Sequence, residues 1–131
     1  MTYGLERLAM LLQGKRTAFE LEWAPGITWG DVYREAERQW SRYNFEEAPV
    51  DVLMRRFEEY EAECRHLLER GLPIPAYDQV LKCSHTFNLL DARGAISVTE
   101  RAAYIARIRR LARGVAESFL QAQEEDAVVA A

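Results

Sequence analysis

The sequence predicts an all-α fold, namely a helical bundle of four to five helices preceded by one short helix that belongs to a different structural layer. Three long segments between residues 49 and 121 carry apolar side chains at three- and four-residue spacing, which places them on one face of each helix. Short connectors rich in glycine and proline separate these segments. With 131 residues, the chain is long enough for one modest domain.

The composition excludes several classes of protein. The chain is 49% hydrophobic and 29% charged, which is typical of a soluble globular protein and not of a disordered one. The net charge of −4 gives no whole-chain signal for nucleic-acid or membrane binding, although local patches could contribute. There is no apolar run of about 20 residues and no signal-peptide pattern. Two cysteines form no disulfide framework, so we expect a cytoplasmic protein without a membrane segment.

The first third of the chain predicts a helix over residues 4–13, then an extended segment over 19–23 where apolar and polar residues alternate. A turn follows at residues 24–26. Thr28 is placed to cap a helix over residues 29–43, with an acidic residue in its first turn.

The next two helices follow from their apolar stripes. The first begins near Pro49 and ends at Gly71; its inward residues are predicted to be Leu53, Phe57, Tyr60, Cys64 and Leu67. Residues 72–75 contain two prolines and predict a rigid connector. The second helix covers residues 76–93 and should end at Gly94 in a left-handed conformation. Its predicted inward residues are Tyr77, Val80, Ser84, Phe87 and Leu90.

The last helix is predicted to start at a capping box formed by Ser97 and Glu100 and to run to about residue 121. Its predicted inward residues are Tyr104, Ile108, Leu111, Val115 and Phe119. Residues 124–131 are acidic and then rich in alanine and valine, so we expect a flexible tail. From the three stripes, we expect Phe57, Tyr60, Val80, Phe87, Ile108 and Leu111 to share one core.

Gly4 and Arg7 could form part of a phosphate site. A glycine allows a ligand to approach the backbone, and an arginine one turn later presents a planar, permanently charged fork. Taken alone, a glycine followed three residues later by an arginine is more often an ordinary surface feature.

A zinc site is suggested by Cys64 with His66 and by Cys83 with His85. Both pairs lie in predicted helices, where residues two apart point away from each other. We therefore expect buried cysteines, surface histidines and no metal site.

Two sets of charged residues remain. Asp91 and Arg101 fall on apolar helix faces on either side of a short connector, and we predict that they pair as a structural clamp rather than bind a ligand. We predict that Arg107, Arg110 and Arg113 share the outward face of the last helix. Such a ridge can contact RNA phosphates, but a solvated face is favoured, with Arg113 paired to Glu117.

The run from Thr2 to Gly14, in which Gly4 is followed by Glu6-Arg7 and an apolar helix, resembles the third signature motif of class II aminoacyl-tRNA synthetases. Its flanks resemble the alpha subunit of the tetrameric bacterial glycyl-tRNA synthetase. Further blocks resemble the same subunit in the same order. They are residues 28–33, residues 43–46 and the run from Leu72 to Tyr104, in which 84–93 and 95–101 are the most particular.

The resemblance implies an ATP-dependent ligase that activates glycine with Mg²⁺ and transfers it to tRNA(Gly). It implies that Arg7 contacts ATP, that Gly4 allows close approach of the nucleotide and that Glu6 helps to orient this site; no catalytic residue is assigned. The implied partners are the beta subunit, tRNA(Gly), glycine and a second alpha subunit, which forms an alpha–alpha dimer in the complete enzyme.

Class II motifs one and two are absent from the sequence, and the connector from Trp23 to Thr28 is shorter than is usual in that family. We therefore expect residues 1–23 to be a remnant of the catalytic domain, comprising the motif-three helix and an extended segment, and residues 24–123 to be the C-terminal helical domain. We expect the 131-residue chain alone to be inactive. The alternative is a non-catalytic helical module that binds a protein or RNA.

Overall fold

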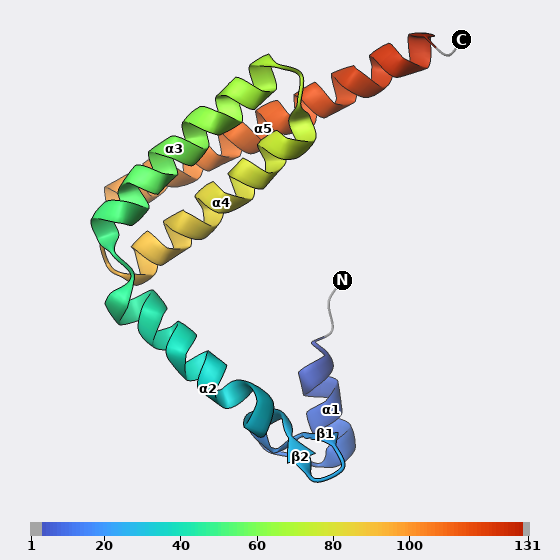
Figure 1. Cartoon of the computed structure of the whole chain (residues 1–131), viewed down its shortest axis with the longest axis vertical. Helices are drawn as coiled ribbons and strands as arrows, with labels where there is room; N and C mark the ends of the chain where they lie inside the picture. The colour runs from blue at the N-terminus through green and yellow to red at the C-terminus, as the bar shows by residue number, and fades with distance from the viewer. Residues whose placement is uncertain (1–3, 130–131) are drawn as a thin grey trace. The chain divides into compact units, whose positions relative to one another are not determined.

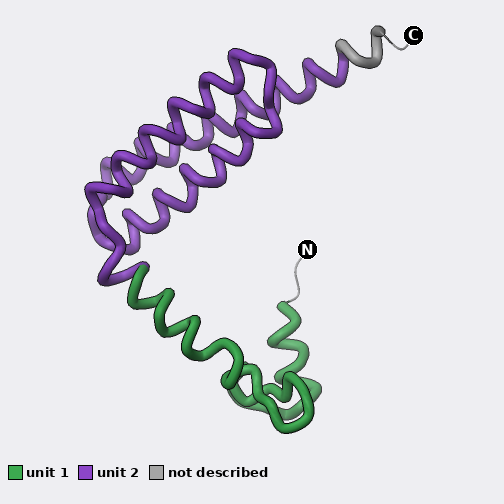
Figure 2. Tube along the Cα trace, in the orientation of Figure 1, with its two compact units in different colours: residues 1–43 green, residues 44–131 purple. Residues whose placement is uncertain are grey.

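The computed structural model describes the backbone of residues 4–129 and the side chains of residues 4–124. The described chain is almost entirely helical and divides into two compact units, residues 1–43 and 44–131 (Figures 1 and 2). The all-α prediction is confirmed. Residues 24–43, which the sequence grouped with the helical domain, lie in the first unit. None of the helices in the described residues is both long and apolar enough to cross a membrane.

The first unit begins with helix α1, Leu5–Gln13, which ends at Gly14 in a left-handed conformation with φ 61°. A short 3₁₀ turn (η1, Ala18–Glu20) leads into an antiparallel hairpin of β1, Glu22–Ala24, and β2, Ile27–Thr28. The extended segment predicted at 19–23 is therefore part 3₁₀ turn and part strand. In the hairpin, Glu22 lies opposite Thr28.

Helix α2, Trp29–Arg42, starts with the predicted cap. The Thr28 hydroxyl accepts a hydrogen bond from the Asp31 amide at 3.1 Å, and the Asp31 carboxylate accepts one from the Thr28 amide at 2.8 Å. This reciprocal pair satisfies two donors that the first turn of a helix leaves without partners. The helix continues without a break into a π-helical turn, η2, Tyr43–Glu47.

An aromatic cluster holds the first unit together. The ring of Trp29 lies 5.6 Å from that of Phe19 and 4.6 Å from that of Tyr33, and Trp23 meets Tyr33 edge to face at 5.3 Å. Gly30 allows this packing, because a Cβ there would lie 2.7 Å from the Phe19 carbonyl oxygen. The beginning of α2 therefore packs closely against η1.

The second unit is a three-helix bundle of α3, Val50–Glu69, α4, Pro73–Ala92, and α5, Val98–Val129 (Figure 1). Its core contains Phe57, Val80, Phe87 and Leu111 as buried residues, with Tyr60 and Ile108 partly buried against them. The predicted shared core is confirmed. Gly94 has φ 63°, and Ser97 and Glu100 form the predicted capping box.

Several predicted details of the bundle were wrong. Residues 73–75 form the first turn of α4 and not a connector, since prolines are tolerated where a helix needs no backbone donor. Tyr77 is 50% exposed, because α4 turns a different and wider arc inward. Phe119 is 40% exposed, and α5 continues as helix to Val129 instead of ending near residue 121. The expected flexible tail, 124–131, lies partly outside the described residues.

Candidate functional site

The candidate nucleotide residues lie at the start of α1. Gly4 is the N-cap, with φ 70° and ψ 94°, and its carbonyl oxygen accepts a hydrogen bond from the Arg7 amide at 3.1 Å. The positive φ favours glycine, whereas space does not require it, because an added Cβ would meet only Arg7 side-chain atoms at 3.9 Å. Gly4, Glu6 and Arg7 are all exposed. Thr2 and Tyr3, which belong to the same motif, lie outside the described residues.

Helix α1 is anchored at its far end. The Gln13 side-chain oxygen accepts a hydrogen bond from the Glu22 amide at 2.8 Å, and its side-chain nitrogen donates to the Glu22 carbonyl at 3.4 Å. This contact ties α1 to β1 and so fixes the direction of the helix within the first unit. The backbone donors of the first turn and the Arg7 guanidinium both favour an anion.

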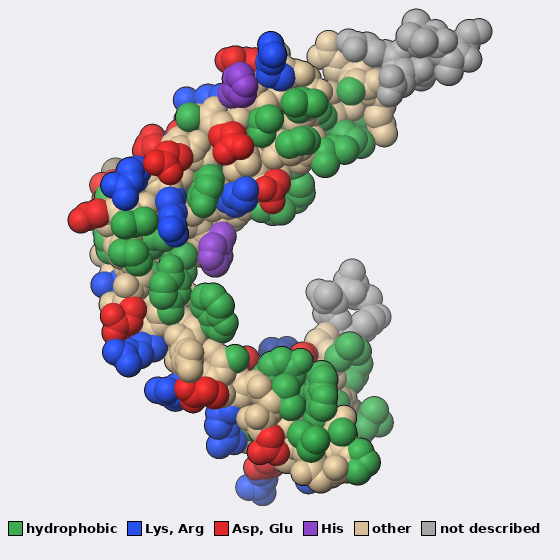
Figure 3. Space-filling view, in the orientation of Figure 1, with side chains coloured by type: hydrophobic (Ala, Val, Ile, Leu, Met, Phe, Trp, Pro, Cys, Tyr) green, Lys and Arg blue, Asp and Glu red, His purple; other side chains and the backbone are tan. Residues whose placement is uncertain are grey.

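Much of the α1 surface is apolar. Leu5, Leu8, Leu11 and Leu12 have between 44% and 86% of their surface exposed, and hydrophobic side chains gather over this part of the first unit in Figure 3. Such a helix face usually packs against another layer.

The cysteine and histidine pairs are separated as predicted. Cys64 and Cys83 are buried in the bundle core, while His66 and His85 are exposed. Burial raises the pKa of both thiols, that of Cys83 to about 12, so neither is a reactive thiolate at neutral pH. In the described residues, no group of three or more His, Cys, Asp or Glu could hold a metal ion.

Asp91 and Arg101 lie together, with the Arg101 Nη2 and the Asp91 Oδ2 3.3 Å apart. Their side chains are 32% and 56% exposed, so water screens the pair more than the apolar surroundings in the sequence suggested. The role of the pair as a structural clamp stays a prediction.

We expect Arg101→Leu to lower the free energy of unfolding by less than about 1 kcal/mol, because exposed ion pairs contribute little. Urea denaturation followed by far-UV circular dichroism measures this. A loss of several kcal/mol would show that the pair is more strongly desolvated than its exposure indicates.

Arg107 was wrongly assigned to the outward face of α5. Its side chain is only 23% exposed, and its Nε donates to the buried carboxylate of Glu61 at 3.2 Å. Its Nη2 also donates to Glu58 at 2.8 Å. The guanidinium lies over the Phe57 ring at 4.7 Å and the Tyr104 ring at 5.3 Å. Arg107 is therefore a structural residue of the core.

The remaining arginines of the proposed ridge are exposed. Arg113 pairs with Glu117 at 2.9 Å, as predicted, and Arg110 lies on the surface. Acidic and basic side chains are intermixed over the visible face of the bundle (Figure 3). With Arg107 turned inward, the solvated-face interpretation is favoured over a continuous basic ridge.

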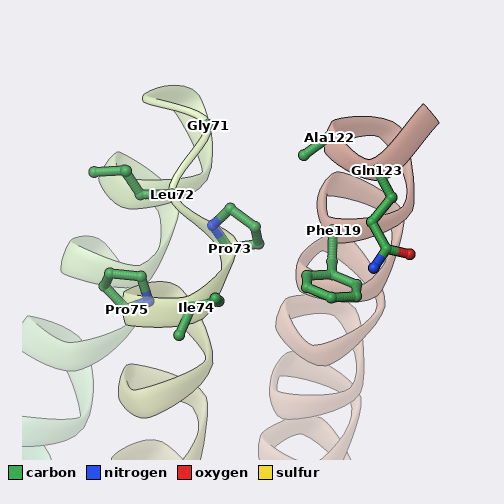
Figure 4. Close-up of a pocket in the computed structure, with 8 residues that line it drawn as sticks. All are labelled: Gly71, Leu72, Pro73, Ile74, Pro75, Phe119, Ala122 and Gln123. Atoms are coloured by element: carbon green, nitrogen blue, oxygen red, sulfur yellow. The ribbon is translucent and has the colours of Figure 1, made fainter. Parts of the chain in front are cut away.

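A groove of about 390 Å³ opens at one end of the bundle, between the α3–α4 connection and α5 (Figure 4). Its lining is mostly apolar and includes Leu72, Ile74 and Phe119, with Gln123 as a polar side chain. It carries no charged lining residue and lies within the second unit. The groove therefore does not resemble a phosphate site.

Two structural contacts of the bundle were not predicted from the sequence, those of Glu61 and Arg93. Glu61 lies four residues after Phe57 and three before Cys64, so its position on the apolar stripe was a usable signal of burial. Arg93 contacts carbonyl groups 45 and 48 residues away, which no local pattern reveals.

A comparison with protein-family models matches residues 1–124 to the model of the glycyl-tRNA synthetase alpha subunit. The match covers nearly the whole 131-residue chain and includes both the α1 segment and the bundle. It agrees with the order of the sequence blocks that resemble this subunit. The chain therefore belongs to the glycyl-tRNA synthetase alpha subunit family.

Proposed function

We propose that this chain serves the ATP-dependent ligation of glycine to tRNA(Gly) in the cytoplasm, and that Arg7 is its contact to the nucleotide. The observation that supports Arg7 is its place in the first turn of α1, exposed and three residues after Gly4, whose φ is 70°. There the guanidinium and the positive end of the helix dipole can both attract a negatively charged ligand. Gly4 allows a close approach of the ligand, and Glu6 helps to orient the site.

In the proposed reaction, the glycine carboxylate attacks the α-phosphate of ATP and pyrophosphate leaves, which gives glycyl-adenylate. A hydroxyl group of the tRNA then attacks the glycyl carbonyl, and AMP leaves. Arg7 holds negative charge on the nucleotide and so positions the reacting phosphate. Bound Mg²⁺ supplies further neutralisation of phosphate charge.

The proposed partners are the beta subunit, tRNA(Gly) and a second alpha subunit. The exposed leucines of α1 are consistent with a helix that is covered in a larger assembly. The 131-residue chain alone is proposed to be inactive, because Arg7 is the cationic group that the family resemblance assigns to the nucleotide, and in-line phosphate chemistry needs groups at both ends of the reacting phosphate.

Glycine-dependent ATP–pyrophosphate exchange tests this proposal. In the complete alpha–beta enzyme, Arg7→Ala should lower the exchange rate by about 10²–10³-fold, the loss expected when one preorganised charge-stabilising group is removed. Arg16→Ala is the matched control, since Arg16 is also an exposed arginine of the first unit, and it should leave exchange near the parent rate.

The 131-residue chain alone should show no exchange near that of the complete enzyme. Full exchange by the Arg7→Ala enzyme would show that Arg7 is not the nucleotide contact. Robust exchange by the chain alone would overturn its proposed inactivity. The alternative of a helical module that binds a protein is favoured by one feature, the apolar groove beside Phe119. That alternative gains support if the 131-residue chain neither assembles with the beta subunit nor supports exchange when it is mixed with that subunit.

A further inference from the structure

The segment that joins the two units is a helix with an unusual end. Helix α2 continues into η2, which ends at Glu47, and Pro49 follows two residues later. Proline has no backbone N–H and disfavours helical conformation in the residue before it, so the helix must stop here. The last carbonyl groups of a helix have no donors within the helix and need partners from elsewhere. One of them belongs to Ala48, which is only 1% exposed and so has little access to water.

Arg93 supplies these donors. Its Nε donates to the Ala48 carbonyl at 3.1 Å, and its Nη1 donates to the Phe45 carbonyl at 2.6 Å. A single planar guanidinium thus spans two carbonyl groups of the same helix end. Its positive charge also lies where the helix dipole is negative.

The position of Arg93 is itself fixed. It is the C-cap of α4, its amide donates to the Leu89 carbonyl at 2.9 Å, and Gly94 with φ 63° turns the chain away immediately afterwards. The guanidinium is therefore presented from the end of a helix that is firmly packed in the bundle. Arg93, Phe45 and Ala48 all belong to the second unit, whose first residue is Asn44.

We propose that Arg93 is a conformational latch for residues 44–48, at the start of the second unit. With the latch closed, residues 44–48 are held as an ordered helix end on the bundle. When it opens, the carbonyl groups of Phe45 and Ala48 lose the Arg93 donors, and the end of η2 loosens from the bundle. The latch thereby controls how firmly residues 44–48 are held within the second unit, a property that does not depend on the proposed function.

Hydrogen exchange of the full chain tests the latch. In Arg93→Met, the amides of residues 45–48 should exchange at least about 10-fold faster, while core amides of α3, α4 and α5 stay within about two-fold of the parent. Arg93→Lys should behave like Arg93→Met, because one ammonium cannot span two carbonyls as the fork does. Arg113→Met is the control, since it also removes an arginine from the second unit but breaks only an exposed pair.

Unchanged exchange at residues 45–48 would overturn the latch. An equal increase throughout the bundle would also overturn it, because Arg93 would then be a general stabilising residue. Protection retained in Arg93→Lys would show that a point charge suffices and would reject the forked contact.

Discussion

Arg107→Met is expected to destabilise the bundle by about 3–5 kcal/mol, because it leaves the Glu61 carboxylate buried without its main partner. The Glu61 side chain is only 5% exposed, and Arg107 donates to it from both Nε and Nη2. Arg65 also pairs with Glu61 at 2.9 Å, but the Arg65 side chain is 60% exposed. Arg65 can therefore replace only part of the stabilisation that Arg107 gives to the Glu61 carboxylate. Urea denaturation followed by far-UV circular dichroism gives the change in the free energy of unfolding.

The double replacement Arg107→Met with Glu61→Met is the decisive control. It removes the stranded charge and leaves two flexible apolar side chains, so it should recover a large part of the loss. Arg109→Met, at an exposed position of the same helix, should change stability by less than about 0.5 kcal/mol. A double variant as unstable as the single one would show that the loss comes from packing against Phe57 and Tyr104 and not from the carboxylate.

The same pair predicts how the effect depends on pH. Hydrogen bonds from Arg107 lower the pKa of Glu61. The stabilising contribution is therefore present above the unfolded pKa of about 4.3 and is lost as the pH falls through the lower folded value. In Arg107→Met, burial instead favours the neutral acid, which removes the stranded charge as the pH falls. The stability difference between parent and variant should narrow from pH 7 to pH 4; a constant difference would contradict this account.

Local signals in the sequence predicted the helix ends best. The capping boxes at Thr28–Asp31 and Ser97–Glu100 and the left-handed glycine at Gly94 depend on residues three positions apart or fewer, and all three are present. The apolar stripe of α3 was also predicted well, because this helix buries one face. Such features need no knowledge of the rest of the fold.

Features that depend on neighbouring helices were predicted less well. Helix α4 packs against both α3 and α5, so it buries a wide arc that includes Gln79, Thr86 and Leu89, and a single stripe cannot describe it. Arg107 lies three residues after Tyr104 and four before Leu111, which places it near the inward face. It was nevertheless grouped with Arg110 and Arg113, because charged residues are usually exposed and its partner is 46 residues away.

In the candidate site, too, local features could be predicted from the sequence and contacts with other elements could not. The start and end of α1 follow from the glycines at positions 4 and 14, and the structure has the helix between them. The sequence pattern could not show that Gln13 ties α1 to Glu22, because that contact depends on the hairpin that follows. The role proposed for Arg7 comes from the family resemblance alone, since an exposed arginine carries no burial or pairing signal that would mark it as a ligand contact.

Phe57→Ala is the second large effect, with an expected loss of about 3–5 kcal/mol in the free energy of unfolding. Phe57 is fully buried, and its ring meets Tyr104 edge to face at 4.7 Å and lies under the Arg107 guanidinium. Truncation therefore leaves a cavity and also removes two ring contacts, each of which can add to the transfer free energy. Phe45→Ala is the matched control, since that side chain is 60% exposed and only its backbone carbonyl contacts Arg93.

Phe57 and Arg107 should also be coupled. If the cation–π contact contributes as the geometry indicates, the losses from Phe57→Ala and Arg107→Met will not add, and the double variant will be more stable than their sum by about 0.5–2 kcal/mol. Urea denaturation of the four proteins of this cycle, at pH 7 and at one low ionic strength, gives the coupling. If the losses of the two single variants add, Phe57 stabilises the core by filling volume and not through its contact with Arg107. A loss below about 1 kcal/mol in the free energy of unfolding for Phe57→Ala would contradict its place at the centre of the core.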